Sequence, residues 1–188
     1  MSVHVWLFSG YAGSGKTTAA NILTSLFDPK TTFVTAFADA VKDDVAHIYN
    51  LPRSMFDTQE GKASIVKTPD GERTARELLI DYSLAMKEAH GEAVWAEEVV
   101  RRIKHVVERR DIQNIIIHDW RYLTEIETLQ NEHTFILHTI RVCRSCVKSL
   151  PIPSEHNIDN YKTDITILND GSIDDLKLQI ARITNSHN

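Results

Sequence analysis

The amino-acid sequence predicts an α/β domain built around a parallel β-sheet. Short runs of β-branched and aromatic residues alternate with longer helical patterns, which is typical of parallel strands joined by crossover helices. The chain has 188 residues, and one hydrophobic core can grow to about 250 residues before a protein divides into domains. We therefore expect a single domain spanning residues 1–188.

The predicted elements follow one another in a regular order. Runs of apolar and β-branched residues predict strands at 3–9, 32–37, 114–118, 135–141 and 164–168. Helical patterns lie between and after them, at 16–27, 39–49, 73–90, 93–109, 122–132 and 172–184. The last helix has a clear start signal, because Ser172 can cap it and Asp175 stands at the third helical position of a capping box.

Two segments of about 20 residues have no clear period. Residues 50–72 contain two prolines and two glycines, and residues 142–161 contain Pro151 and Pro153 among polar residues. Connections of this length inside one domain usually form lids or binding loops. We expect residues 142–161 to form a lid, and residues 50–110 to take part in ligand binding.

The composition argues against several classes of protein. The formal net charge is −5, from 21 Lys and Arg against 26 Asp and Glu, so no overall field attracts nucleic acid or anionic lipid. No apolar run approaches the ~18 residues of a membrane-spanning helix, and the first residues lack the positive charges of a secretory signal. We expect a cytoplasmic protein without a membrane partner.

The two cysteines, Cys143 and Cys146, are too few for a disulfide framework. Their spacing is that of half a zinc site or of a redox pair, and His138 or His156 could complete a zinc site. A zinc site usually has two pairs of ligands, and the two residues of each pair lie close together in the sequence. We therefore favour two reduced thiols in the lid.

Residues Gly10 to Thr17 match the nucleotide-binding pattern G-x-x-x-x-G-K-[ST] without a mismatch, between an apolar strand and a helix. The glycines of such a P-loop let backbone N–H groups turn toward phosphate oxygens, and the helix N-terminus adds positive potential. Lys16 is expected to act in catalysis at the terminal phosphates of ATP, and Thr17 to bind magnesium. The predicted ATP-binding residues of this loop are Gly10, Ala12, Gly13, Ser14, Gly15, Lys16, Thr17 and Thr18.

A carboxylate at the end of a neighbouring buried strand usually completes the magnesium site. Asp119 follows the apolar run 115–117 by two residues, and we expect it to hold the ion through water. The alternative is that the Asp119 carboxylate caps the loop before the helix that begins near Tyr122.

The acceptor side of a kinase needs its own evidence. Phosphoryl transfer depends on positioning and charge neutralisation, so a phosphate acceptor requires cationic clamps rather than a base. Arg121, Arg141 and Arg144 lie near the carboxyl ends of predicted strands, where α/β sheets bind ligands, and we expect them to be catalytic. Each could instead be an ordinary surface residue. Further candidate cations are Lys42, Arg53, Arg76 and Lys87.

Asp39 follows the second predicted strand. In this position a carboxylate suits an acceptor contact, or a general base that removes a proton from a hydroxyl acceptor. It equally suits a cap for the helix that follows, and the two roles do not exclude each other.

Several further segments, in order along the chain, resemble the phage-type deoxynucleoside monophosphate kinases. Residues 37–42 are similar to that family's F-A-D-P-L-K element, and residues 118–125 are similar to its D-x-R-x-x-x-E stretch. The central helices resemble the family at residues 76–79, followed by Gly91 and Trp95. The closing part is similar at residues 154–155, at 167–172 and at Leu176.

This resemblance implies a three-layer P-loop NTPase fold, with a five-stranded parallel sheet of order 2-3-1-4-5, helices on both faces and a mobile lid after the fourth strand. It implies a kinase that uses ATP and Mg²⁺, with adenine packed near Asn169 and Gly171. The chain departs from the family at residues 80–82, where acceptor contacts are expected. The acceptor-binding residues that the resemblance suggests are Asp39, Lys42, Arg76, Trp95 and Arg121.

A related group of phage kinases, which phosphorylate the hydroxymethyl group of 5-hydroxymethyluracil in DNA, is similar at the same level. Such an enzyme needs a base for an alcohol and access for an extruded nucleotide. A local basic face on the helix 93–109 and the residues after it could bind DNA. The glutamates on the same helix favour an ordinary solvated face instead. The basic residues in question are Arg101, Arg102, Lys104, Arg109 and Arg110.

A P-loop ATPase or GTPase switch is a further alternative. GTPases usually carry an N-K-x-D guanine motif, which the sequence lacks. We favour an ATP-dependent kinase that acts on a free deoxynucleoside monophosphate.

Overall fold

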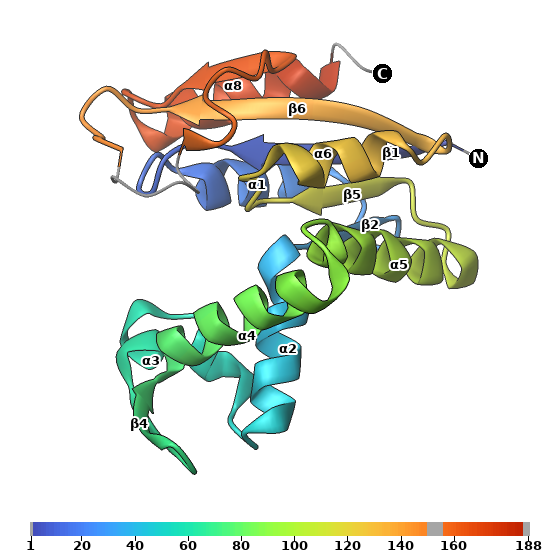
Figure 1. Cartoon of the computed structure of the whole chain (residues 1–188). Helices are drawn as coiled ribbons and strands as arrows, with labels where there is room; N and C mark the ends of the chain where they lie inside the picture. The colour runs from blue at the N-terminus through green and yellow to red at the C-terminus, as the bar shows by residue number, and fades with distance from the viewer. Residues whose placement is uncertain (1, 150–155, 186–188) are drawn as a thin grey trace.

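The computed structural model describes residues 2–149 and 156–185 (Figure 1). In the central sheet, strands lie in the order β2-β5-β1-β6-β7, and every neighbouring pair is parallel. Counted along the chain without the separate β3–β4 hairpin, this order is 2-3-1-4-5, which confirms the predicted sheet. The five strands are β1 (Val3–Ser9), β2 (Thr32–Thr35), β5 (Asn114–Ile117), β6 (Phe135–Cys143) and β7 (Ile165–Leu168).

Helices pack on both faces of this sheet because its strands are apolar on both sides. In β1, Val5 and Leu7 belong to the core shared with α5 and α6, whereas Trp6 and Phe8 belong to the core shared with α1 and α8. All four side chains are at most 2% exposed, as expected for the central strand of a parallel sheet. The helices are α1 (Lys16–Leu26), α5 (Val94–Arg109), α6 (Leu123–Gln130) and α8 (Ile173–Asn185).

The chain between β2 and α5 forms a lobe that projects from the sheet (Figure 1). A third hydrophobic core, which includes Val45, Phe56, Leu78 and Trp95, holds the lobe together. Residues 50–72, for which the sequence predicted irregular structure, therefore contain regular elements. The elements of the lobe are α2 (Phe37–Ile48), the 3₁₀ turn η1 (Arg53–Phe56), α3 (Gln59–Ala63), the hairpin of β3 (Ile65–Thr68) and β4 (Gly71–Thr74), and α4 (Ala75–His90).

Several boundaries differ from the prediction by a few residues. The second strand ends at Thr35, and α2 begins at Phe37, two residues before the predicted start. The strand β6 continues to Cys143, two residues beyond the predicted end at Arg141. At α8 the predicted capping box is present, because the Asp175 N–H donates to Ser172 Oγ over 3.2 Å and the Ser172 N–H donates to Asp175 Oδ2 over 2.9 Å.

The predicted lid is described only in part. Residues 150–155, with Pro151, Pro153 and the Ser154–Glu155 pair of the family resemblance, lie outside the described residues. Residues 142–149 and 156–161 flank them at the end of β6 and before β7. A search of the helices in 2–149 and 156–185 finds none that is long and apolar enough to cross a membrane.

Candidate functional site

The loop between β1 and α1 has the tight geometry that its glycines predict. Gly10 has φ 134°, and a Cβ atom there would lie 2.2 Å from the carbonyl oxygen of Val142. Gly15 has φ 98°, and a Cβ atom there would lie 2.3 Å from Asn169 Nδ2. Any side chain at either position would therefore clash, as well as strain the backbone. The two glycines let the loop pass directly against β6 and the residues after β7.

Lys16 and Thr17 begin α1 directly after this loop. The Lys16 side chain is buried and folds back over the loop, where its Nζ donates a hydrogen bond to the carbonyl oxygen of Tyr11 over 2.9 Å. Thr17 and Thr18 are exposed. Among the described residues no side chain caps the N-terminus of α1, and the N-terminus of a helix suits an anion.

Asn169 connects the end of the sheet to the P-loop. Its side-chain Nδ2 donates to the carbonyl oxygen of Ser14 over 2.9 Å, and its backbone N–H donates to the carbonyl oxygen of Cys143 over 2.7 Å. A cavity of about 490 Å³ opens beside this contact and brings the predicted phosphate-binding and adenine-binding residues together. It is lined by Gly13, Gly15, Lys16, Thr17, Thr18, Arg144, Asn169, Gly171, Ile173 and Leu176.

A second cavity, of about 330 Å³, lies between the lobe and the loop after β5. Its walls are mostly apolar, and it contains four of the residues predicted for acceptor or magnesium binding: Lys42, Trp95, Asp119 and Arg121. Residues of α4 at helical spacing form one wall. The complete lining is Phe37, Ala38, Val41, Lys42, Leu79, Ile80, Ser83, Leu84, Lys87, Glu92, Trp95, Ala96, Asp119, Arg121, Tyr122, Thr124 and Glu125.

Asp119 caps a different helix from the one considered in the sequence analysis. Its Oδ1 accepts the N–H of Phe37 over 2.8 Å and its Oδ2 accepts the N–H of Ala38 over 3.0 Å, so the carboxylate holds the N-terminus of α2. The helix near Tyr122 is capped by Glu125 instead, whose Oε2 accepts the N–H groups of Arg121 and Tyr122 over 2.8 and 2.9 Å. Each oxygen of the Asp119 carboxylate thus accepts one backbone N–H of α2.

Glu125 is a lining residue to which the sequence analysis assigned no role of its own. Its side chain is only 8% exposed. Burial raises the pKa of the Glu125 carboxyl to about 8, and repulsion from Asp119 adds to the effect, although two backbone N–H donors oppose it. The Glu125 carboxyl group is consequently a proton-binding group at the edge of the second cavity.

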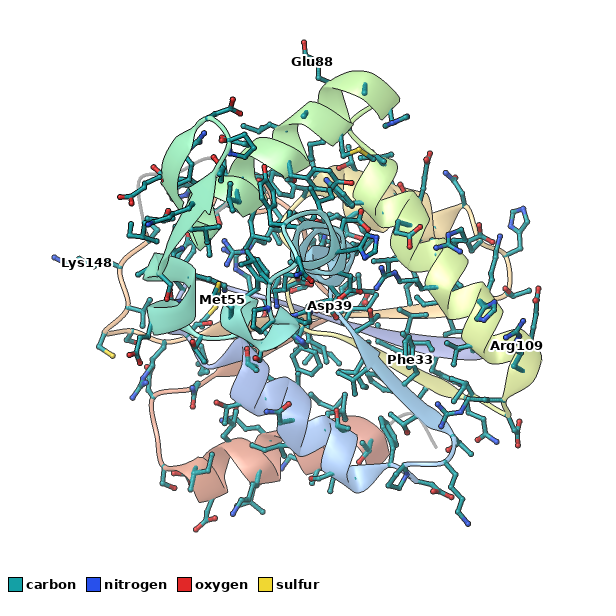
Figure 2. The ribbon with its side chains drawn as sticks, turned by 90° about the horizontal axis from the view of Figure 1, so that it is seen from below. Phe33, Asp39, Met55, Glu88, Arg109 and Lys148 are labelled. Carbon is teal, nitrogen blue, oxygen red and sulfur yellow. The ribbon has the colours of Figure 1, made fainter. Side chains whose placement is uncertain are left out.

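Asp39 acts as a helix cap and ion-pair partner in this structure. Its Oδ2 accepts the N–H of Ala36 over 2.9 Å, and its Oδ1 accepts a hydrogen bond from Arg53 Nη2 over 2.9 Å. Lys42 Nζ lies 3.7 Å from the same Oδ1. Figure 2 shows Asp39 where β2 leads into α2. Asp39 is not among the residues that line the second cavity.

The three predicted arginines all line cavities. Arg144 lines the cavity beside the P-loop, whereas Arg121 lines the second cavity. Arg141 and Arg144 also line a further cavity of about 330 Å³ with Gly10, Tyr11 and Ser14 of the P-loop. Arg141 contacts the far part of the predicted lid: its Nη1 donates to the carbonyl oxygen of Ile158 over 3.0 Å, and its Nη2 pairs with Asp159. The Tyr11 hydroxyl also donates to Asp159, over 3.0 Å, so Arg141 and the P-loop hold the same carboxylate.

Arg76 lies outside both cavities. Its Nη2 donates to Gln59 Oε1 over 2.6 Å, which joins α4 to α3. The sequence analysis named it as a candidate cation for the acceptor and, from the resemblance, as an acceptor-binding residue, whereas the structure places it on the exposed side of the lobe next to α3.

Three basic residues of α5, Arg101, Arg102 and Lys104, are paired with carboxylates of their surroundings. Arg101 pairs with Glu98 over 2.7 Å, and Lys104 pairs with Glu132 over 2.8 Å. Arg102 donates to both Glu98 and Asp43. This part of the surface is therefore a mixed face rather than a basic one, as the glutamates of the helix suggested.

The two cysteines are free thiols in the structure, with Cys143 half-buried and Cys146 exposed. In the part of the chain that the structure describes, no three His, Cys, Asp or Glu side chains are grouped so that they could hold a metal ion.

Comparisons with known proteins address the fold. No family model and no curated protein matches the sequence. Similar solved structures include TT1252 from Thermus thermophilus, with a TM-score of 0.55 and 16% identity over 99% of this chain and 97% of that one. APS kinase from Mycobacterium tuberculosis, in complex with AMPPNP and APS, has a TM-score of 0.47 and 13% identity over 98% of both chains. Shikimate kinase from Acinetobacter baumannii has a TM-score of 0.43 and 13% identity over 100% of this chain and 95% of that one.

The likeness to TT1252 extends over almost the full length of both chains. Together with the strand order β2-β5-β1-β6-β7 and the P-loop directly after β1, it shows that the chain has the P-loop NTPase fold, an α/β architecture with a five-stranded parallel sheet.

Proposed function

We propose that this protein is a magnesium- and ATP-dependent phosphotransferase whose acceptor is a free deoxynucleoside monophosphate. The observation that carries the proposal is the pair of cavities at the carboxyl ends of the sheet strands. One is built around the P-loop after β1, and the other around the residues that follow β2 and β5. A phosphoryl donor and an acceptor need two such neighbouring sites.

The donor cavity offers the groups that a nucleoside triphosphate requires. The first N–H groups of α1 and the Lys16 ammonium suit the phosphates, and the residues around Asn169 and Gly171 suit the base. The buried hydroxyl of Ser14 has no hydrogen-bond partner within the described residues, so a bound ligand could provide one.

A magnesium ion would bind where the donor cavity meets the second cavity. Thr17, whose exposed hydroxyl lines the donor cavity, would bind it directly, and Asp119, which lines the second cavity, would contact it through water. The ion would neutralise the negative charge that develops between the bridging and terminal phosphate oxygens.

The second cavity suits a nucleotide better than a small polar metabolite. Phe37 and Trp95 contribute aromatic surface on which a base can pack, while Lys42 and Arg121 contribute cations for its phosphate. The volume of about 330 Å³ is within the range of small-molecule sites.

The contacts of Asp39 favour a monophosphate over a hydroxyl acceptor. A phosphate monoester is already an anion near neutral pH, because its second pKa is about 6, and it needs no base. A hydroxymethyl group must lose a proton during transfer. The carboxylate suggested for that task is paired with Arg53 and lies outside the lining of the second cavity.

The surface charge also favours a free nucleotide over DNA. Three of the five cations suggested for a phosphate backbone, Arg101, Arg102 and Lys104, are already paired with Glu98, Asp43 or Glu132. An exposed pair still screens the field of its cation, so this face attracts a polyanion weakly.

The experiment that tests the proposal supplies γ-labelled ATP and magnesium with a panel of acceptors: deoxynucleoside monophosphates, nucleosides, plain DNA and DNA containing 5-hydroxymethyluracil. We expect labelled deoxynucleoside diphosphate, and no product with Lys16→Ala. Label found only in the modified DNA would support the DNA kinase instead. Release of phosphate without any labelled acceptor would support an ATPase.

A further inference from the structure

Asp159 lies in the far part of the predicted lid, a few residues before β7, and the proposed function has not used it. Three side chains meet at its carboxylate. The Tyr11 hydroxyl lies 3.0 Å from both oxygens, and Arg141 Nη2 pairs with Oδ1. His156 Nδ1 lies 2.7 Å from Oδ2. Because Tyr11 belongs to the P-loop and Arg141 to β6, one carboxylate joins three segments of the chain.

The Asp159 carboxyl group is ionised near neutral pH. Burial acts to raise its pKa, but hydrogen bonds from Arg141, His156 and Tyr11 hold that pKa below the ordinary value of 3.8. The contact with the Arg141 guanidinium is therefore charge-assisted, and such hydrogen bonds are stronger than those between neutral groups. Asp159 can consequently hold the guanidinium group in one place.

Two hydrogen bonds and one ring contact fix the Arg141 guanidinium. Asp159 accepts from Nη2, and the carbonyl oxygen of Ile158 accepts from Nη1 over 3.0 Å. The guanidinium carbon lies 5.4 Å from the centre of the Tyr11 ring, within the range of a cation–π contact. A guanidinium group has five N–H donors, and two are used here, which leaves three without a hydrogen-bond partner among the described residues. These three donors remain for a ligand.

The place where a ligand could meet these donors is a third cavity, of about 330 Å³. Arg141 lines it together with Gly10, Tyr11 and Ser14 of the P-loop. Arg144 lines both this cavity and the donor cavity, so the two adjoin. The buried Ser14 hydroxyl has no hydrogen-bond partner within the described residues. A phosphate group at this junction would therefore lie between the P-loop and Arg141.

Tyr11 relates Arg141 to Lys16. The carbonyl oxygen of Tyr11 accepts a hydrogen bond from Lys16 Nζ over 2.9 Å, while the Tyr11 ring lies against the Arg141 guanidinium. Both cations thus have the same residue as a support. Asp159 binds this residue and Arg141, yet it is not among the residues that line any of the three cavities. Asp159 can therefore act on a phosphate ligand only through its partners.

We propose that Asp159 is a positioning residue for phosphoryl transfer, which holds the Arg141 guanidinium against Tyr11 so that the remaining N–H donors of Arg141 face the terminal phosphate of ATP. This inference rests on the proposed function and adds to it a residue that acts through Arg141. Catalysis of phosphoryl transfer depends on where the cations stand, because negative charge spreads over the oxygens of the transferring group. A displaced guanidinium group would stabilise that charge less.

Steady-state kinetics of Asp159→Asn are the first test. This variant keeps a side-chain oxygen for Arg141 but loses the negative charge. We expect kcat to fall about tenfold or more, with the KM values for ATP and for the monophosphate within a few fold. Glu132→Gln is the matched control and should have wild-type kinetics. Glu132 pairs with Lys104 near the opposite end of β6, and its side chain is 23% exposed against 27% for Asp159.

A double-mutant cycle shows whether Asp159 acts through Arg141. Once Arg141 is replaced by alanine, Asp159→Asn should have no further effect on kcat, because no guanidinium group is left to position. All rates are measured below the melting temperature of every variant, so that unfolding does not contribute. Effects on kcat that multiply in the double variant would overturn the inference, and so would an unchanged kcat in Asp159→Asn.

A measurement without turnover checks the contact itself. The ¹³C NMR signal of Tyr11 Cζ, identified with the Tyr11→Phe variant, reports on the hydrogen bond of the Tyr11 hydroxyl. We expect Asp159→Asn to shift this signal in the unliganded protein at neutral pH, whereas Glu132→Gln should leave it in place. A signal that does not respond to Asp159→Asn would mean that Asp159 does not hold the P-loop, which would overturn the inference even in an active kinase.

The outcomes separate this inference from the proposed function. If no acceptor is phosphorylated, the proposed function fails, and the same cycle is measured on the phosphate that is released from ATP. Dependence of the Asp159→Asn effect on Arg141 in that reaction would still support the positioning role. A protein that neither phosphorylates an acceptor nor releases phosphate would overturn both.

Discussion

Arg53 donates a hydrogen bond from Nη2 to Asp39 Oδ1 over 2.9 Å, and thereby connects η1 to the first turn of α2. The same arginine also pairs with Asp43 over 2.6 Å and with Asp57 over 2.7 Å. Three carboxylates from two neighbouring elements thus surround one guanidinium group. Asp39 therefore has a structural task in the lobe, whatever it does for the acceptor.

The variant Asp39→Asn separates the two possible acceptor chemistries. With a monophosphate acceptor, we expect a raised KM and a modest effect on kcat, since no proton has to leave the attacking oxygen. With a hydroxyl acceptor, loss of the base would lower kcat about 10²–10⁴-fold while KM is nearly preserved. Steady-state kinetics at saturating ATP and magnesium decide between them. Rescue by a higher magnesium concentration would place Asp39 at the metal site and contradict both expectations.

Lys16→Ala is expected to abolish phosphoryl transfer, because the lysine neutralises charge that develops between the bridging and terminal phosphates. Thermal unfolding of the unliganded protein should change little, because the hydrogen bond from Lys16 Nζ to the carbonyl oxygen of Tyr11 is made within the P-loop itself. Lys30→Ala, in the exposed turn before β2, is the matched control. A Lys16→Ala rate above about a hundredth of wild type, a loss under ~3 kcal/mol, would contradict a catalytic P-loop.

The two arginines at the end of β6 are expected to differ. Arg144→Ala should raise the KM for ATP several-fold, because Arg144 lines the cavity beside the P-loop. Arg141→Ala should lower kcat with the KM for ATP within a few fold, and it should also lower the melting temperature, because Asp159 loses a half-buried partner. Kinetics and thermal melts of both variants are the measurement. An identical pattern in the two would refute this division of roles.

The sequence predicted the sheet and the P-loop well because both depend on local patterns. The apolar run 115–117 and the glycines of residues 10–15 specify a buried strand and a phosphate-binding turn without help from distant residues. The start of α2 was missed for the opposite reason. The run 33–37 is apolar except for Thr35, so periodicity cannot separate strand from helix. The carboxylate of Asp119 that caps α2 comes from about 80 residues away.

The lobe and the acceptor side were predicted less well. Pro69 and Gly71 suggested a loop, whereas they turn a hairpin between β3 and β4. Which cation lines a cavity depends on how the lobe packs, and the sequence could not distinguish Arg121, in the cavity, from Arg76, outside it. The spacing of Leu79, Ser83 and Lys87 on one side of α4 was a usable signal for the cavity wall.

Glu125 should make the stability of the protein depend on pH. Burial raises its pKa in the folded state to about 8, above the ordinary value of 4.5 that applies to the unfolded chain. A group with a raised folded pKa contributes stability that is complete below pH 4.5 and is lost as the pH rises through about 8.

Glu125→Gln cannot ionise, but its amide oxygen can still accept the N–H groups of Arg121 and Tyr122. We expect the wild type to lose unfolding free energy relative to Glu125→Gln between pH 5 and pH 8, by an amount on the order of a few kcal/mol at most. Denaturant unfolding of both proteins across this range measures the difference, with Glu127→Gln, an exposed neighbour on α6, as the control for charge alone. A constant difference across the range would mean that Glu125 is ionised in the folded protein, held by its two backbone donors against the effect of burial.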